Sequence, residues 1–110
     1  MTTSNQTVWI LKASVMDRSG ALTSIASAFS NQGINLDAAA GFGALDNSPS
    51  QGNVVVAFHG TEDQRDIMVR RIKRLQKVTQ VQWIEDTREH LKQALFDLAT
   101  HLESCSDGTI

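Results

Sequence analysis

The segment Asp17-Arg18-Ser19-Gly20 decides the fold, because it separates a strand-like run from an amphipathic helix. In the run before it, residues 7–17, the side chains alternate between a purely apolar face and a mixed face. Such alternation is typical of a β-strand that buries one face. The purely apolar face, which we assign to the core, carries Trp9, Leu11, Ala13 and Val15.

The segment after this turn, residues 21–32, has the apolar spacing of an amphipathic helix. Its apolar stripe consists of Leu22, Ile25, Ala26 and Phe29. Gly33 follows, and we expect it at the helix C-terminus because glycine adopts a left-handed conformation at little cost. Strand propensity resumes at residues 34–40, so the helix lies between the first turn and Asn35.

A turn-rich segment, residues 41–52, contains the single proline of the chain, Pro49, and predicts a long hairpin loop. The loop is long enough for a lid or contact arm, and it is equally compatible with a simple hairpin tip. The next strand is expected over residues 52–59, where consecutive valines indicate a central strand that is buried on both faces.

Two further helices and one strand complete the chain. Thr61 and Gln64 fit a capping box at the start of the second helix, whose inner stripe is Met68, Ile72 and Leu75. A strand is expected at residues 79–84, and another capping box at residues 86–89 predicts a last helix over residues 87–104. The apolar stripe of that last helix consists of Leu91, Ala94, Leu95, Leu98, Ala99 and Leu102.

The order β-α-β-β-α-β plus a C-terminal helix predicts an α+β fold of the ferredoxin-like type. We expect a four-stranded antiparallel sheet with two helices on one face and a bare opposite face. The expected organisation is a flexible N-terminus at residues 1–6, one domain at 7–86, an amphipathic helix at 87–104 and a flexible tail at 105–110. The last helix can pack on the bare sheet face or on a partner chain, and we favour oligomerisation.

The bulk composition excludes several classes of protein. Of the 110 residues, 41% are hydrophobic and 20% are charged, which fits one globular domain. No apolar run approaches the roughly 18 residues that a membrane-spanning helix needs, and no signal-peptide pattern is present. A formal net charge of −2 argues against nucleic acid as a partner. We therefore interpret the basic residues of the second helix as a solvated face; they are Arg65, Arg70, Arg71, Lys73, Arg74 and Lys77.

The single cysteine, Cys105, cannot form an internal disulfide, which fits a reducing compartment and predicts a cytoplasmic protein. The histidines show no metal-ligand spacing with it, so we expect no metal site. The sequence has no nucleophile elbow, no phosphate-binding loop and no dinucleotide fingerprint. It therefore predicts a protein that is not an enzyme and needs no cofactor.

With Asp17, Gly20 and the Gly33-Ile34-Asn35 run inside this order of elements, the chain resembles the ACT domain family over residues 7–86. It is similar to free-standing ACT regulatory proteins and to the ACT domain of acetolactate synthase small subunits. Many relatives have proline where this chain has Ser19, and the acetolactate synthase small subunits usually carry a second C-terminal domain. These departures favour a free-standing module or one that serves another enzyme.

The resemblance implies a regulatory module that binds an amino acid or related metabolite at the interface of a homodimer or higher oligomer. Its partner would be a metabolic enzyme. The implied ligand-binding residues are Asp17, Arg18, Ser19, Gly20, Ala21, Leu22 and Asn35. The helix N-terminus would hold a carboxylate, and Asp17 would accept hydrogen bonds from an ammonium group.

The same turn residues can also serve the turn and the helix cap alone. The alternative function is therefore an effector-free interaction or dimerisation module that holds a partner with its C-terminal helix.

Overall fold

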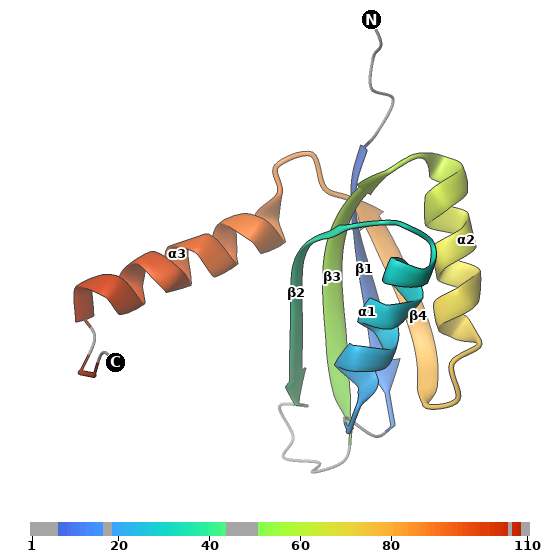
Figure 1. Ribbon diagram of the computed structural model, residues 1–110, viewed down its shortest axis with the longest axis horizontal. Coiled ribbons are helices and arrows are strands. Elements are labelled where there is room, and N and C mark those ends of the chain that lie inside the picture. Colours follow the sequence, from blue (N-terminus) through green and yellow to red (C-terminus); the bar gives the residue numbers. More distant parts are fainter. Residues whose placement is uncertain (1–6, 17–18, 44–50, 106, 109–110) are drawn as a thin grey trace, which may run out of the picture.

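The computed structural model describes residues 7–16, 19–43, 51–105 and 107–108. It confirms the predicted order of elements (Figure 1). In chain order the elements are β1 (Thr7–Val15), α1 (Ala21–Asn31), β2 (Leu36–Gly43), β3 (Gly52–Gly60), α2 (Glu62–Lys73), β4 (Val78–Glu85) and α3 (His90–Cys105). Residues 44–50 of the predicted hairpin loop lie outside the described residues.

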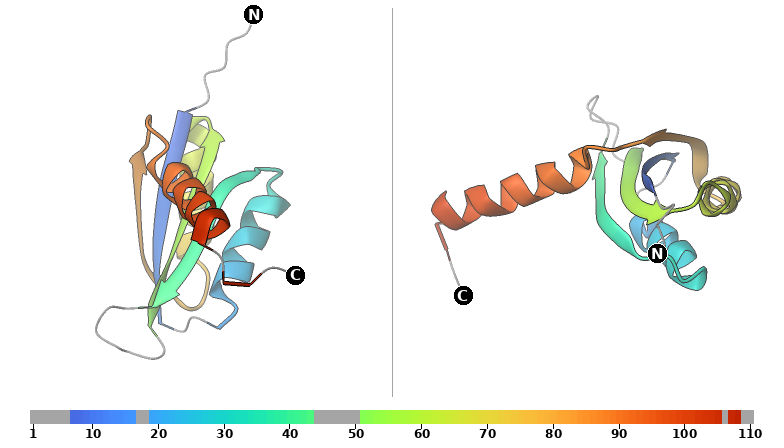
Figure 2. Two further views of the ribbon diagram at one scale, coloured as in Figure 1. Left: turned by 90° about the vertical axis from the view of Figure 1, so that its left-hand side faces the viewer. Right: turned by 90° about the horizontal axis from the view of Figure 1, so that it is seen from above.

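The four strands form one sheet in the order β2-β3-β1-β4, and every neighbouring pair is antiparallel. The predicted ferredoxin-like α+β fold is therefore confirmed. The valine-rich strand β3 is central, as predicted, while β2 and β4 are the two edges. Helices α1 and α2 cover one face of the sheet (Figures 1 and 2).

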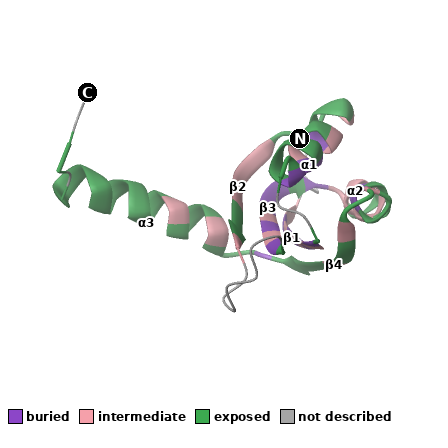
Figure 3. Cartoon of the chain, turned by 90° about the horizontal axis from the view of Figure 1, so that it is seen from below, coloured by how far each residue is buried: buried purple, intermediate pink, exposed green. Residues whose placement is uncertain are grey.

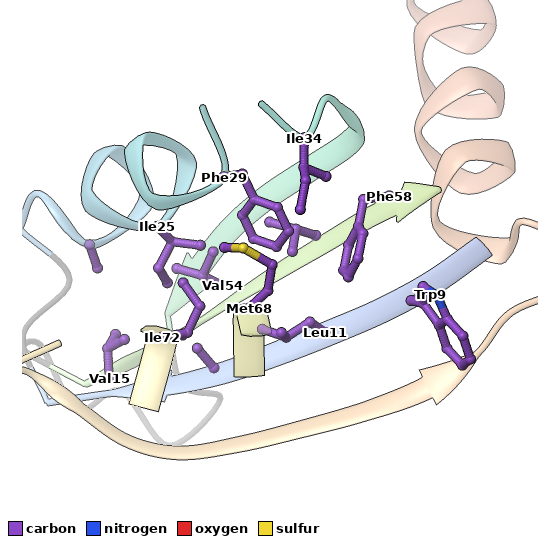
Figure 4. Close-up of a cluster of buried hydrophobic side chains, with 13 residues drawn as sticks. Trp9, Leu11, Val15, Ile25, Phe29, Ile34, Val54, Phe58, Met68 and Ile72 are labelled. Atoms are coloured by element: carbon purple, nitrogen blue, oxygen red, sulfur yellow. The ribbon is translucent and has the colours of Figure 1, made fainter. Parts of the chain in front are cut away.

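The hydrophobic core fills the layer between the sheet and these two helices (Figure 4). The four residues predicted for the inner face of β1 are all buried. Phe29 of α1 and Phe58 of β3 meet at the centre, with ring centroids 4.8 Å apart. Met68 and Ile72 of α2 complete the contact from the other helix and are fully buried. These residues belong to one continuous hydrophobic cluster.

The predicted C-terminal glycine of α1 and the predicted capping box of α2 are confirmed. Gly33 has φ of 70° and, with Ile34, closes α1 in a Schellman motif. In that motif the Ile34 N–H donates to the Phe29 carbonyl at 3.0 Å, and the Gly33 N–H donates to the Ser30 carbonyl at 2.9 Å. Thr61 and Gln64 form both hydrogen bonds of the predicted capping box on α2.

Three details of the sequence reading are wrong. Leu22 is not part of the buried stripe of α1: it is 39% exposed, and Ala21 takes its place in the core. The reason is that α1 meets the sheet through residues 21, 25 and 29, which puts Leu22 at the margin beside Gly41 of β2. Helix α2 ends at Lys73, so Leu75 lies beyond it and is only partly buried.

The third error concerns α3, which begins at His90 and not at Thr87. Glu89 has a left-handed φ of 51°, which is incompatible with the predicted capping box at residues 86–89. The buried carboxylate of Asp86 caps the helix differently, by accepting a hydrogen bond from the His90 backbone at 2.7 Å. Asp86 also contacts the His90 ring, with Oδ1 2.5 Å from Nδ1.

Helix α3 contains no buried residue and projects away from the domain on the side of β2 (Figures 1 and 3). It exposes Phe96, Leu98 and Leu102, and among the described elements it contacts mainly β2 and β3, near its start. The sheet face opposite α1 and α2 is therefore not covered by α3. On that face Ile10 pairs with Ile84, and Ile84 is 57% exposed.

The core predicts a graded response to truncation of Phe58. Phe58→Ala should lower the free energy of unfolding by about 3–5 kcal/mol, because it leaves a cavity beside Phe29. Phe58→Leu keeps most of the buried volume and should cost about 1.5 kcal/mol or less. Urea denaturation followed by circular dichroism measures both values. Equal losses for the two variants would contradict this account of the core.

Candidate functional site

The turn between β1 and α1 is the first part of the predicted site. Gly20 is the N-cap residue of α1 and has φ of 73° and ψ of −2°. A side chain is strained in this left-handed conformation, so the backbone favours glycine here. Ala21 is buried behind the turn, and Ser19 and Leu22 face outward. Asp17 and Arg18 lie outside the described residues.

The N-terminus of α1 differs from that of α2. Among the described residues, no side chain caps α1, and its first turn contains no acidic residue. By contrast, α2 has the Thr61 cap and two acidic residues in its first turn. The first N–H groups of a helix carry a partial positive charge and point outward. The N-terminus of α1 is therefore suited to an anionic group such as a carboxylate.

Two hollows flank this turn. The larger has a volume of about 410 Å³ and lies between the turn and the end of β2, where Gly41 and Phe42 line it. The smaller has a volume of about 180 Å³ and lies on the α2 side, where Lys77 lines it. Ser19 and Ala21 line both hollows. Small-molecule sites typically occupy 300–1,000 Å³, and the larger hollow falls within that range.

Asn35, the other predicted site residue, lies at the opposite end of α1. The helix has 11 residues, and at 1.5 Å per residue it is about 16 Å long. Asn35 lines a separate polar hollow of about 340 Å³ together with Asp37, His59 and Gln64. The structure thus brings Ser19, Gly20, Ala21 and Leu22 together in one place, and it does not bring Asn35 to them within one chain.

The sequence analysis did not identify one cluster of three side chains with metal-binding chemistry. Asp37, His59 and Glu89 each contribute one potential metal-ligand atom, and these atoms lie within 4.8 Å of one another. Asp37 also forms a hydrogen bond and ion pair with Nδ1 of His59. The three residues come from β2, β3 and the turn before α3. No short spacing in the sequence signals them, because the sheet brings them together.

Arg65 also departs from the predicted solvated face of α2. Its side chain is 12% exposed, and its guanidinium lies 4.6 Å from the Trp9 ring centroid and 4.0 Å from that of Trp83. This is a cation–π arrangement that closes the core at the β4 edge. Arg70, Arg71, Lys73 and Arg74 remain exposed, as predicted.

A sequence profile decides the family of this chain. The profile, described as AHAS small subunit-like ACT domain, matches residues 11–80. The chain belongs to the ACT domain family. ACT domains are regulatory modules that bind small molecules, and the match runs from the middle of β1 to the first part of β4. A comparison with curated protein sequences finds no match.

Solved structures share the fold of this ACT domain. The ACT domain from GTP pyrophosphokinase of Chlorobium tepidum superimposes with a TM-score of 0.63 at 11% identity, covering 79% of this chain and 96% of that one. The C-terminal domain of the MgtC protein from Mycobacterium tuberculosis gives a TM-score of 0.59 at 13% identity, covering 80% and 96%.

A homoserine dehydrogenase from Thiobacillus denitrificans gives a TM-score of 0.58 at 20% identity over 73% of this chain. The matched region covers only 17% of that dehydrogenase. At these identities the three likenesses show the fold. No helix in the described part of the chain has the length and apolar character needed to cross a membrane.

The turn geometry predicts a specific cost of substitution at Gly20. Gly20→Ala should lower the free energy of unfolding by about 1 kcal/mol, because the new side chain is strained at φ of 73°. Gly20→Asn should cost less, since asparagine tolerates this conformation better. Gly41→Ala is the control and should change stability by no more than about 0.5 kcal/mol. Equal effects of the two alanine variants in urea denaturation would argue against the strain.

Proposed function

We propose that the protein is a non-enzymatic regulatory module that binds an amino acid or a related metabolite between two copies of the chain and controls a metabolic enzyme. One observation carries this proposal: a hollow of about 410 Å³ lies next to the edge strand β2 at the N-terminus of α1, which no described side chain caps. Family membership supports the regulatory role. We place the protein in the cytoplasm, in keeping with its single, free Cys105.

The ligand would bind through its carboxylate to the N–H groups at the start of α1. Gly20 leaves the approach to these groups open, because no heavy atom of the described residues beyond its chain neighbours lies within 4 Å of where its Cβ would be. Leu22, Gly41 and Phe42 would contact the side chain of the ligand, since they line the same hollow. Asp17 stays a predicted partner for the ammonium group, and Arg18 a predicted neighbour of the ligand.

A second copy would complete the site. Strand β2 is an edge, and edge strands carry backbone groups that can pair with another chain. Two-fold pairing of β2 with its copy is antiparallel, so the beginning of one strand meets the end of the other. Asn35 of the second copy would then lie near Gly41 and Phe42 of the first copy. Within one chain, Asn35 is about 16 Å from the hollow along α1. Pairing of the two copies would bring Asn35 of the second copy to the ligand of the first.

Regulation would follow from differential affinity. A ligand held by both copies would stabilise the dimer. It would shift the equilibrium of the complex with the partner enzyme between two conformational states only as far as its affinities for those two states differ. The module itself needs no catalytic group for this role.

Calorimetric titration of the protein with each of the twenty amino acids tests the proposal. We expect at least one to bind, and we expect Gly41→Leu to abolish binding because the larger side chain enters the hollow. Gly41→Ala is the matched control: its Cβ would lie 3.8 Å from Leu22, an ordinary contact, so binding should persist. If none of the amino acids binds the unchanged protein, the amino-acid version of the proposal fails.

Mixing two defective variants tests the shared site. Asn35→Ala should also weaken binding, although Asn35 lies far from the hollow in its own chain. Equal amounts of Gly41→Leu and Asn35→Ala chains, unfolded and refolded together, should recover about a quarter of the wild-type sites, because each mixed dimer keeps one intact site. Recovery of no sites would indicate that both residues act within one chain.

The second candidate function is an effector-free interaction or dimerisation module, which the exposed α3 favours. This helix buries no residue and exposes Phe96, Leu98 and Leu102. It leaves the domain on the side of β2, so it extends toward a copy or partner that pairs there (Figure 1). Leu98 and Leu102 are four residues apart and therefore share one face of the helix. An exposed apolar face typically marks an interface.

Leu98→Glu combined with Leu102→Glu tests this candidate. If α3 holds the assembly together, the double variant should shift the sedimentation profile to the monomer, because charged groups would have to be buried. Gln93→Glu combined with Thr100→Glu introduces the same charge at other positions of the helix and serves as the control. Complete removal of residues 87–110 should have the same effect as the double leucine variant. Unchanged assembly in both would leave α3 without an interface role.

A further inference from the structure

Three side chains with metal-binding chemistry converge where α3 leaves the sheet. The ligand atoms of Asp37, His59 and Glu89 lie within 4.8 Å of one another. The set offers one imidazole nitrogen and two carboxylate oxygens. Imidazole nitrogens and carboxylate oxygens both bind zinc, and zinc sites with three protein ligands keep a fourth position open to water. We propose that Asp37, His59 and Glu89 bind one Zn²⁺ ion.

The backbone positions the two sheet residues by an irregularity in the strand pairing. The register of β2 against β3 shifts between Leu36 and Ala38, so Asp37 is left outside the regular pairs. An irregularity of this kind changes the direction in which a side chain points, and β-bulges are frequent beside functional sites. Asp37 thereby contacts Nδ1 of His59, which lies three residues before the start of α2.

The segment after β4 brings Glu89 to this pair. His59 pairs with Val8, and the Val8 carbonyl accepts a hydrogen bond from the Asp86 N–H at 2.8 Å. Asp86 is therefore fixed to β1, the strand that pairs with His59. A short turn after Asp86 then brings Glu89 close to His59. The Glu89 N–H donates to the Asp86 carbonyl at 3.2 Å, and its φ of 51° is uncommon for a residue with a side chain.

The charges of the cluster favour a cation. Two carboxylates lie close together, and like charges at such distances repel each other. Lys92 is a distant partner for this pair: its Nζ lies 4.0 Å from Glu89, and its side chain is 57% exposed. A divalent ion would neutralise both carboxylates at once. It would also replace the proton that joins Asp37 to His59, since metal ligands must be deprotonated.

The surroundings leave room for the remaining ligands of the ion. Asp37 and His59 also line the polar hollow of about 340 Å³, whose other walls include Asn35 and Gln64. Amide groups such as these can hold water molecules on the open side of a zinc ion. The ion would also connect the turn before α3 to β2 and β3. It would thereby limit the movement of a helix that buries no residue of its own.

Titration of the full-length chain with Zn²⁺ by calorimetry tests the proposal. All samples carry Cys105→Ser, because the thiol lies 3.9 Å from His101 Nδ1 and the two could bind zinc by themselves. We expect one Zn²⁺ per chain, and we expect His59→Ala and Glu89→Gln each to weaken its affinity by about 100-fold or more. Mg²⁺ should bind far more weakly, because it prefers oxygen ligands and keeps its water shell.

His101→Ala and Glu103→Gln are the matched controls, since both residues are exposed on α3 and lie outside the cluster. They should leave the zinc affinity within about twofold of the parent chain. Thermal unfolding without metal checks that each variant is folded. Zn²⁺ should raise the melting temperature of the parent chain and of the controls, and leave that of Glu89→Gln unchanged.

Hydrogen exchange supplies a readout that depends on α3 itself. Zn²⁺ should slow exchange of the amides in the first turn of α3 in the parent chain and not in His59→Ala. The proposal is overturned if the parent chain binds no zinc. It is equally overturned if the His59 and Glu89 variants bind as tightly as the His101 and Glu103 controls, because the ion would then sit elsewhere.

Discussion

The rest of the structure depends on the pairing of β1 with strands on both of its sides. β1 is hydrogen-bonded to β3 and to β4, and its inner face contributes Trp9, Leu11, Ala13 and Val15 to the core. Because β1 occupies this central place, the turn that follows it opens directly onto α1 and the sheet margin. Burial of the inner face against α1 and α2 holds the turn at Gly20 in position.

In the described part of the chain, this arrangement leaves three surfaces uncovered: the sheet face opposite α1 and α2, the β2 edge, and the stripe of α3. All three lie away from the buried core, and two of them, β2 and α3, lie on the same side of the domain (Figures 1 and 2). A regulatory ACT domain that acts through a second chain needs such surfaces. The same side of the molecule carries the Asp37, His59 and Glu89 cluster, so pairing at β2, placement of α3 and metal binding would affect one another.

Features set by neighbouring residues could be predicted from the sequence. The capping box of Thr61 and Gln64, the left-handed Gly33 and the alternation of β1 all follow from interactions across a few residues. The prediction failed where the outcome depended on packing. Leu22 fits the apolar spacing of α1 as well as Ala21 does, and only the angle at which α1 meets the sheet leaves Leu22 exposed. The start of α3 moved to His90 because the Asp86 carboxylate caps that residue, a choice that depends on the burial of Asp86.

The sequence by itself determined the order of strands and helices, the ferredoxin-like fold, the family and the turn at Gly20, because periodicity and backbone preference act locally. Only the tertiary structure decided which distant side chains meet. Arg65 packs against both Trp9 and Trp83, and Asp37 meets His59 and Glu89, because strand register brings separate segments together. The same structure separated Asn35 from Gly20 by the length of α1. Strand register and helix length determine distances between residues that are far apart in the sequence, so no short sequence motif predicts these distances.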